Sequence, residues 1–453
     1  MTIHFRRKLL AFFIALFFML GISALYYSQG YRIDFSTWTI KKTGAVYIEG
    51  YQRPVDIYLN STHYNDQSGF LKNGTLISSI LPKKYQLTVT KNGFYTYEKN
   101  IQVEPSQVVR LFHALLVPTT IATTTITTGV QGNTITEVAG DGSFITKSLG
   151  TPTHYTAYSF PLPTASSTAT DITASSSTFT KQKFSAVAFY PQHQNLFIGT
   201  SNTGLFRIDP VQKKITEIYS GEVDFYTTQG DTLYIIAPIA PIATSTATST
   251  PTQKKQQTKK QAPPNPAGII IASVSDPTQA TSTERYPATF YGTNTANFEV
   301  RGQYQALLLK SGELFLYDTT QATTTQLSSH AKYFSFSPDG RKFLWQDTTG
   351  EVFVYMLDND LEALNARQGD IISLHLIDTA NIQHLWWYTD SYHLLLAYPN
   401  TVTLAEVSTI DPNNAFPVAS GSYQDIAYVQ QKNTLLLLGN DGTLTTINLD
   451  FSP

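Results

Sequence analysis

The sequence predicts a mainly β protein with one N-terminal transmembrane helix, and three observations lead to this prediction. An uncharged run of membrane-spanning length lies near the N-terminus, strand-like alternation of apolar and polar residues follows it, and a strand–turn–strand unit then recurs to the C-terminus. The composition also favours strands, because aromatic residues make up 13% of the chain and charged residues only 14%. A chain of 453 residues is long enough for one small and one large domain.

Charge and cysteine content exclude several classes of function. The formal net charge of −2 provides no field that would attract nucleic acid over the whole molecule, so we expect no nucleic-acid partner. The chain has no cysteine, which excludes disulfides, thiolate metal sites and a cysteine nucleophile.

Residues 9–27 form the predicted transmembrane helix. This run contains no charged residue and, at about 1.5 Å per residue, roughly spans a ~30 Å hydrocarbon layer. The basic residues Arg6–Lys8 precede it, whereas only Arg32 follows closely. The positive-inside rule therefore places residues 1–8 in the cytoplasm and the remaining chain outside, as a single-pass protein of the cell membrane. The alternative is a cleaved signal peptide with Ile22–Ala24 at the cleavage site, and the chain is exported in either case.

A juxtamembrane spacer over residues 28–43 precedes a small predicted β-domain at residues 44–118. Val55, Ile57 and Leu59 share one face at period two, which is typical of an antiparallel sheet with one buried face. Further strands are predicted at Ala45–Ile48, Tyr85–Thr90, Ile101–Val103 and Val108–Leu116.

This small domain resembles the PEGA domain, a sandwich common in bacterial surface proteins. Leu81-Pro82 followed by Tyr85 matches the family's Leu-Pro-x-x-Tyr pattern, and Asn92-Gly93-Phe94 matches its glycine–aromatic turn. The namesake tetrapeptide reads Gln52-Arg53-Pro54-Val55 here, and Lys84 replaces the family's usual glycine. The resemblance implies a spacer or an envelope-interaction module.

Residues 119–453 contain a recurring strand–turn–strand unit. The clearest copy runs from Tyr333 to Tyr355 and includes the turn Pro338-Asp339-Gly340 between two strands. One such unit cannot bury both of its faces alone, so several must pack around an axis. The pattern predicts a β-propeller of six to seven blades, and Ser337–Gly340 resembles the turn of TolB-type and WD-repeat-like propellers. A set of β-sandwiches is the alternative, but it does not explain the recurrent spacing.

The last repeat is one strand short, and polar segments interrupt the others. We expect the Thr-rich segment Ile121–Thr128 to pair with the last repeat and close the ring, so that deleting residues 119–130 lowers the melting temperature sharply. Segments near residues 164–180 and 244–267 are rich in Thr, Ser, Ala, Pro and Gln and are expected to be disordered. Thr278–Glu284 is a third polar interruption, and it too is not expected to order firmly.

No residue is identified as catalytic, cofactor-binding or metal-binding. Gly-x-Ser-x-Gly, phosphate-loop and His-Glu-x-x-His motifs are absent. His384 and His393 flank one core strand, but their separation is not a ligand spacing, so we expect them to be exposed or hydrogen-bonded. Asp358–Glu362 resembles a calcium loop, yet Ala363 and Gly369 occupy positions that need glycine and an acid. We therefore expect a loop leading into a short helix.

The aromatic cluster Trp386-Trp387-Tyr388 has two interpretations. Exposed, it would form a platform for sugars or peptides. Strand alternation instead places Trp386 and Tyr388 on one face and Trp387 on the other, which favours packing in the core.

These observations predict a membrane-anchored, extracytoplasmic envelope protein that is not an enzyme and needs no cofactor. Its propeller is expected to act as a binding scaffold for a protein or a cell-envelope polymer. One alternative is a propeller-type glycosidase or lyase with carboxylates at the central channel. The other is a purely structural component of a surface assembly.

Overall fold

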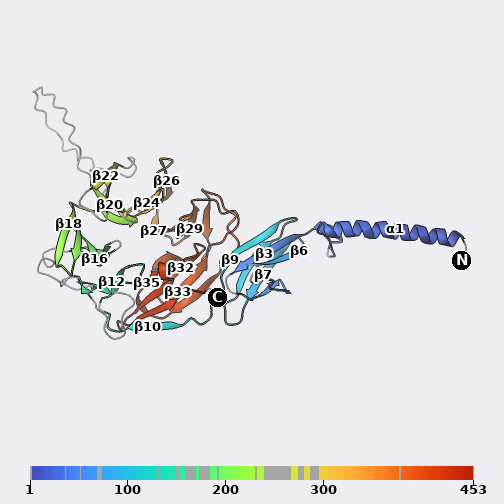
Figure 1. Cartoon of the computed structure of the whole chain (residues 1–453), viewed down its shortest axis with the longest axis horizontal. Helices are drawn as coiled ribbons and strands as arrows, with labels where there is room; N and C mark the ends of the chain where they lie inside the picture. Colours follow the sequence, from blue (N-terminus) through green and yellow to red (C-terminus); the bar gives the residue numbers. More distant parts are fainter. Residues whose placement is uncertain are drawn as a thin grey trace, which may run out of the picture.

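The protein is mainly β, with one long N-terminal helix, as the sequence predicts (Figure 1). The computed structural model describes residues 3–35, 37–50, 53–68, 74–130, 132–148, 154–158, 170–172, 184–190, 193–229, 232–238, 267–273, 280–285, 295–376 and 379–451.

Helix α1 (Ile3–Ser28) extends away from the rest of the molecule, with the N-terminus at its far end (Figure 1). The stretch Arg7–Ser28 has a mean hydropathy of 2.4, and none of its apolar part is buried inside the protein. A helix that is apolar on every side needs an apolar environment. Its length and composition fit a membrane-spanning anchor and a signal sequence alike.

Residues 28–43 contain a β-hairpin, which differs from the predicted spacer. Strand β1 (Tyr31–Asp34) pairs antiparallel with β2 (Thr39–Lys42), and Ile33 lies opposite Ile40. Gly30 lies between α1 and β1 with φ +87°, a conformation that costs glycine little because it has no Cβ. The chain therefore enters the hairpin directly after the helix.

The small domain consists of two sheets, with strand orders β5-β4-β7-β8 and β6-β3-β9. All pairs are antiparallel except β3 with β9, which are parallel. Ile57 and Leu59 lie in the buried core between the sheets, and Val55 packs against it, as the alternation predicts. Strands β5 and β6 are not among those that the sequence predicts. The strands are β3 (Gly44–Gly50), β4 (Asp56–Leu59), β5 (Thr62–Asn65), β6 (Gly74–Ile80), β7 (Lys84–Thr90), β8 (Tyr97–Gln102) and β9 (Val108–Ala114).

The described residues after β9 form seven four-stranded antiparallel sheets. The first comprises β11 (Thr134–Val138), β12 (Phe144–Ser148), β13 (His154–Tyr158) and β14 (Thr170–Asp171), and the second β15 (Ala186–Tyr190), β16 (His193–Ser201), β17 (Gly204–Asp209) and β18 (Lys214–Ser220). The third comprises β19 (Phe225–Gln229), β20 (Thr232–Pro238), β21 (Ala267–Ser273) and β22 (Ala280–Arg285), and the fourth β23 (Thr295–Arg301), β24 (Tyr304–Leu309), β25 (Leu314–Asp318) and β26 (Thr323–Ser328). The fifth comprises β27 (Ala331–Phe336), β28 (Lys342–Asp347), β29 (Val352–Met356) and β30 (Ile371–Leu374), and the sixth β31 (His384–Trp387), β32 (His393–Tyr398), β33 (Thr401–Glu406) and β34 (Ala415–Ser420). The seventh comprises β35 (Tyr423–Val429), β36 (Thr434–Gly439), β37 (Leu444–Asn448) and β10 (Thr123–Thr127).

The seventh sheet combines strands from opposite ends of this region. β10 pairs antiparallel with β37, with Thr123 opposite Ile447 and Thr124 opposite Thr446. The Thr446 hydroxyl also donates a hydrogen bond to the Thr124 carbonyl at 3.3 Å. The pairing expected for Ile121–Thr128 is therefore confirmed.

Buried apolar clusters lie between consecutive sheets. Val354 of the fifth sheet shares a cluster with Leu394 of the sixth, for example. Another cluster joins Phe144 of the first sheet to Leu436 of the seventh, and β12 lies beside β35 in Figure 1. These clusters pack apolar strands of one sheet against those of another, as expected for strands that cannot be stable alone.

The aromatic cluster of β31 packs as the alternation predicts. Trp387 is buried on one face with Val354, while Tyr388 is buried on the other with Leu437, where Trp386 packs beside it. The cluster contributes to the core.

The polar interruptions lie largely outside the described residues. Within the segment at 164–180, Thr170–Asp171 forms β14, and Ala267, the last residue of the segment at 244–267, begins β21. Thr278–Glu284 differs from the prediction, because Ala280–Arg285 forms the edge strand β22 of the third sheet. Threonine and serine are compatible with an edge strand that faces solvent.

Candidate functional site

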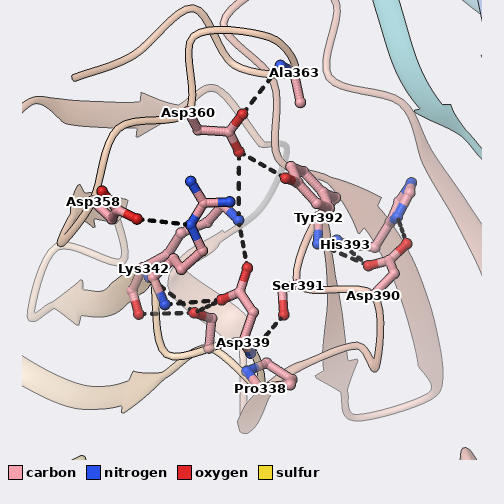
Figure 2. A network of polar contacts seen from close by, with 12 residues as sticks. Pro338, Asp339, Lys342, Asp358, Asp360, Ala363, Asp390, Ser391, Tyr392 and His393 are labelled. Carbon is pink, nitrogen blue, oxygen red and sulfur yellow. Dashed lines mark hydrogen bonds and ion pairs between the residues drawn. The ribbon is translucent and has the colours of Figure 1, made fainter. Parts of the chain in front are cut away.

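A network of polar side chains lies beside the turn that connects β27 to β28 (Figure 2). This turn is the Ser337–Gly340 segment that the sequence analysis identifies as a repeat signature. Gly340 has φ +70°, and its amide donates to the Ser337 carbonyl at 2.9 Å. The Ser337 hydroxyl contacts Asp339 Oδ1 at 2.5 Å and donates to the Lys342 carbonyl at 3.0 Å. The local sequence thereby holds the Asp339 carboxylate next to β28.

Lys342 brings a positive charge into the interior at this point. Its side chain is fully buried, and its Nζ lies 3.1 Å from Asp339 Oδ2 and 3.8 Å from Asp360 Oδ2 (Figure 2). The ammonium also lies 3.9 Å from the centre of the Tyr392 ring. A buried ammonium is costly unless it is paired and hydrogen-bonded, and these three groups supply that compensation.

The Asp339 carboxylate beside Lys342 is held in its charged form. Burial alone would raise the pKa of Asp339, but hydrogen bonds from Ser337 and Arg341 and the charge of Lys342 together lower it. Asp360 accepts a hydrogen bond from the Tyr392 hydroxyl at 2.7 Å and from the Ala363 amide at 3.1 Å.

The acidic residues of the segment that resembles a calcium loop, Asp358 and Asp360, have partners within the protein. Asp360 is committed to Lys342 and Tyr392, and Asp358 pairs with Arg341 at 3.2 Å (Figure 2). The short helix expected after Asp358–Glu362 is not observed, because residues 361–364 form a turn that an isolated bridge between Asp360 and Ala366 closes.

The two histidines singled out from the sequence lie apart and pair with different carboxylates. His393 is buried, and its Nδ1 lies 2.7 Å from Asp390 Oδ2 (Figure 2). Burial would lower the pKa of His393, but the charge and hydrogen bond of Asp390 raise it overall. His384 is partly exposed and lies 3.4 Å from Asp425. Neither geometry is that of a metal site.

The small domain meets this region through a second buried ion pair. Lys99 of β8 has a fully buried side chain, and its Nζ lies 2.9 Å from Glu406 Oε2 on β33. The ammonium also donates to the carbonyls of Ile410 and Pro412, at 2.6 and 2.9 Å. Glu406 in turn accepts a hydrogen bond from the Tyr97 hydroxyl at 2.9 Å. The charges are compensated on both sides, so the two domains are joined by specific buried contacts.

Stacked rings extend this junction towards Lys342. His113, at the end of β9, stacks on Tyr392 with ring centres 3.8 Å apart. Burial lowers the pKa of His113, so its neutral form is favoured against the tyrosine ring. The small domain thus contacts the ring of Tyr392, whose hydroxyl bonds to Asp360 and over which Lys342 lies.

A cavity of about 570 Å³ lies where the first strands of the first three sheets, β11, β15 and β19, approach each other. Glu137 and Asp224 line it together with Lys147, Tyr155 and Tyr226. Burial raises the pKa of Glu137 to about 7, although its carboxylate accepts the Phe189 amide at 2.7 Å. Among the described residues, Asp224 Oδ2 is buried without a hydrogen-bond partner, and burial raises the pKa of this carboxyl too.

Glu137 belongs to a recurrent arrangement that sequence reasoning missed. Its carboxylate accepts a backbone amide from the first strand of the next sheet. The carboxylate of Asp425 on β35 likewise accepts a hydrogen bond from the Ile135 amide of β11 at 2.6 Å. The carboxylate of Glu299 on β23 accepts one from the Phe336 amide of β27. Burial raises the pKa of Glu299 to about 7. The signal available in the sequence is an acidic residue directly before an apolar residue within a first strand, as in Glu137-Val138, Glu299-Val300 and Asp425-Ile426.

Comparison with known proteins identifies no family. No family model matches the chain, and no curated protein matches it. One similar solved structure is PorZ, described as an essential bacterial surface component of the type-IX secretion system of Porphyromonas gingivalis. It has a TM-score of 0.41 and 12% identity, over 73% of this chain and 38% of that chain. Another is a chain of the mitotic checkpoint complex, with a TM-score of 0.44 and 9% identity, over 72% of this chain and 91% of that chain. Similarity at this level assigns neither a function nor a family.

Proposed function

We propose that this chain is a single-pass, membrane-anchored protein whose β-domains stand outside the cytoplasmic membrane and act as a binding scaffold. The observation that carries the proposal is the uncharged and unburied apolar part of α1, residues 9–28, which follows Arg6–Lys8 within the same helix and leads directly into β-structure. The positive-inside rule then orients residues 1–8 towards the cytoplasm and the β-domains outwards.

We further infer that the seven sheets are the blades of a β-propeller. Three features support this: the number of four-stranded sheets, the clusters between consecutive sheets, and the cluster that joins Phe144 to Leu436. The pairing of β10 with β37 adds support, because it ties the start of the repeat region to its end. Such an architecture is a rigid platform whose loops and axial surface suit binding.

The small domain fits the role of a spacer between membrane and propeller. It lies between α1 and the seven sheets (Figure 1), and the buried Lys99–Glu406 pair fixes it to β33. The PEGA-like residues Leu81, Pro82 and Tyr85 agree with an envelope module. The partner would be a protein or a cell-envelope polymer.

Crosslinking in intact cells tests the scaffold role. The full-length protein, recovered after crosslinking from native membranes, should carry a defined protein or polymer in repeated preparations. Recovery of the protein without any reproducible partner would contradict a binding scaffold.

A second candidate function is acid–base catalysis in the cavity of β11, β15 and β19. It is favoured by one observation, namely that Glu137, with a pKa of about 7, and Asp224 line the same cavity. A paired acid and base is the arrangement that glycosidases use. Incubation of the protein with envelope polysaccharides tests it: turnover that disappears in Glu137→Gln supports catalysis, and absence of turnover supports the scaffold.

A further inference from the structure

The β1–β2 hairpin carries an unpartnered apolar surface. Ile33 and Ile40 lie opposite each other in the pairing register, so their side chains share one face. Phe35 and Trp38 follow at the tip, with their rings in T-shaped contact 6.0 Å apart. The exposed fractions are 51% for Ile33, 70% for Phe35, 80% for Trp38 and 64% for Ile40. Exposed clusters of large apolar side chains mark interaction surfaces.

The hairpin is held in a defined place relative to α1. Arg32 Nη1 donates to the Tyr27 carbonyl at 2.8 Å, and its guanidinium lies 3.6 Å from the centre of the Tyr27 ring. Tyr31 makes an edge contact with Tyr26 at 5.3 Å. Arg32 Nη2 also donates to the Ser79 hydroxyl at 3.1 Å, which links the hairpin to β6. The apolar surface therefore has a fixed position next to the end of the helix.

The position and the residue types of the β1–β2 hairpin are those expected at a membrane–water interface. Strand β1 begins three residues after α1 ends at Ser28, so the hairpin lies where a membrane-spanning α1 would leave the bilayer. Tryptophan and tyrosine favour this zone, since their rings are apolar and their N–H and O–H groups polar. Among the cations of the hairpin, Lys41 pairs with Asp34 at 2.7 Å and Arg32 is bonded to Tyr27, whereas Lys42 is exposed and suits a lipid phosphate. A two-stranded hairpin is also marginal without a surface to pack on.

We propose that the β1–β2 hairpin inserts Phe35, Trp38 and the Ile33–Ile40 pair into the outer boundary of the membrane that α1 spans. The occupant of the apolar surface is thus lipid, at the level of the headgroups and the first acyl carbons. The hairpin sets the angle at which the small domain and the seven sheets stand on the membrane. This inference rests on the proposed function only in requiring that α1 spans a bilayer.

Tryptophan quenching tests the proposal on the full-length protein. The protein is reconstituted in phosphatidylethanolamine–phosphatidylglycerol vesicles whose acyl chains are brominated close to the headgroup. Trp38 is one of four tryptophans, and Trp345 and Trp387 are buried in the distant sheets. We expect these lipids to quench about a quarter of the tryptophan emission and Trp38→Leu to abolish that quenching.

A probe inside α1 separates this proposal from the proposed function. Phe17 is 73% exposed near the middle of the helix, so Phe17→Trp in the Trp38→Leu background reports on lipid around α1 when lipids brominated deep in the acyl chain are used. Quenching of the Phe17→Trp probe without quenching of Trp38 overturns the hairpin proposal alone. If, in addition, aqueous iodide does not quench Trp38, the apolar surface is covered by a second copy of the chain or by another protein. Absence of quenching at both positions contradicts the membrane anchor itself.

Discussion

Lys99 of β8 and Glu406 of β33 form a buried ion pair across the boundary between the small domain and the sixth sheet, with 2.9 Å between Nζ and Oε2. Burying two charges is unfavourable unless each is fully compensated. Here the Tyr97 hydroxyl and the Ile410 and Pro412 carbonyls complete the compensation. The pair therefore specifies one relative position of the two domains.

Lys99→Met should destabilise the protein strongly. The substitution leaves Glu406 buried without its cation, and removing one partner of a buried ion pair lowers the free energy of unfolding by about 3–5 kcal/mol. Chemical denaturation of the full-length protein in detergent measures the change. Lys99→Met combined with Glu406→Leu should recover a large part of the loss, because no charge then remains unpaired.

The exposed pair Arg110–Glu362 provides the matched control. It also joins the small domain to the seven-sheet region, at 3.4 Å, but its side chains are 49% and 76% exposed. Exposed pairs contribute about 0–1 kcal/mol, so Arg110→Met should change stability little. Equal losses in Lys99→Met and Arg110→Met would show that burial is not the source of the effect.

The carboxyl of Glu137 should make stability decrease between acidic and neutral pH. Its pKa is raised from 4.5 to about 7, so between these values the folded state binds more protons than the unfolded state. Its contribution is complete below about pH 4.5 and is lost as the pH rises through about 7. The cavity opens to solvent, which limits the contribution to roughly 1–3 kcal/mol.

Glu137→Gln should flatten this part of the pH–stability curve, as measured by denaturation from pH 5 to pH 8. Relative to wild type the variant should gain stability as the pH rises, because glutamine has no proton to lose and its amide oxygen still accepts the Phe189 amide. Glu217→Gln, at an exposed position on β18, is the control and should follow the wild-type curve. Parallel curves for wild type and Glu137→Gln would contradict the raised pKa.

Proline substitution in β10 should test its pairing with β37. Adjacent residues of an antiparallel edge strand point their amides in opposite directions, so only one of Thr124 and Thr125 donates to β37. We expect one of Thr124→Pro and Thr125→Pro to lower the melting temperature by several degrees and the other to lower it less, since proline removes the donor. Unchanged melting in both variants would contradict a stabilising role for β10.

Much of the fold could be predicted because apolar runs and alternation determine which strand faces are buried. Four-residue runs such as Leu435–Leu438 identified central strands, and the Ser337–Gly340 turn identified the clearest repeat. The β1–β2 hairpin was missed because its strands are only four residues long and its apolar face has no partner within the chain. Strand β22 was missed because Thr and Ser in an edge strand look like a loop.

The polar contacts between domains could not be predicted, because alternation does not show which partner a buried side chain meets. The sequence nevertheless contains a signal for Lys99, because alternation places Lys99 on the same strand face as Tyr97 and Ile101, which are both buried. A lysine at a buried position of the pattern requires a counter-charge. Glu137 and Glu299 give the same kind of signal inside first strands, but the cavity and the next sheet's amides follow only from the tertiary arrangement.

Cysteine labelling in intact cells tests the central claim of a membrane anchor with exported β-domains most directly. The chain has no cysteine, so Thr2→Cys and Gln321→Cys each introduce a single thiol, the second at an exposed position between β25 and β26. With a membrane-impermeant maleimide, Gln321→Cys should react in intact cells, whereas Thr2→Cys should react only after permeabilisation, and the labelled protein should remain in the membrane fraction. Labelling of Thr2→Cys in intact cells, or of Gln321→Cys only after permeabilisation, would contradict the proposed topology.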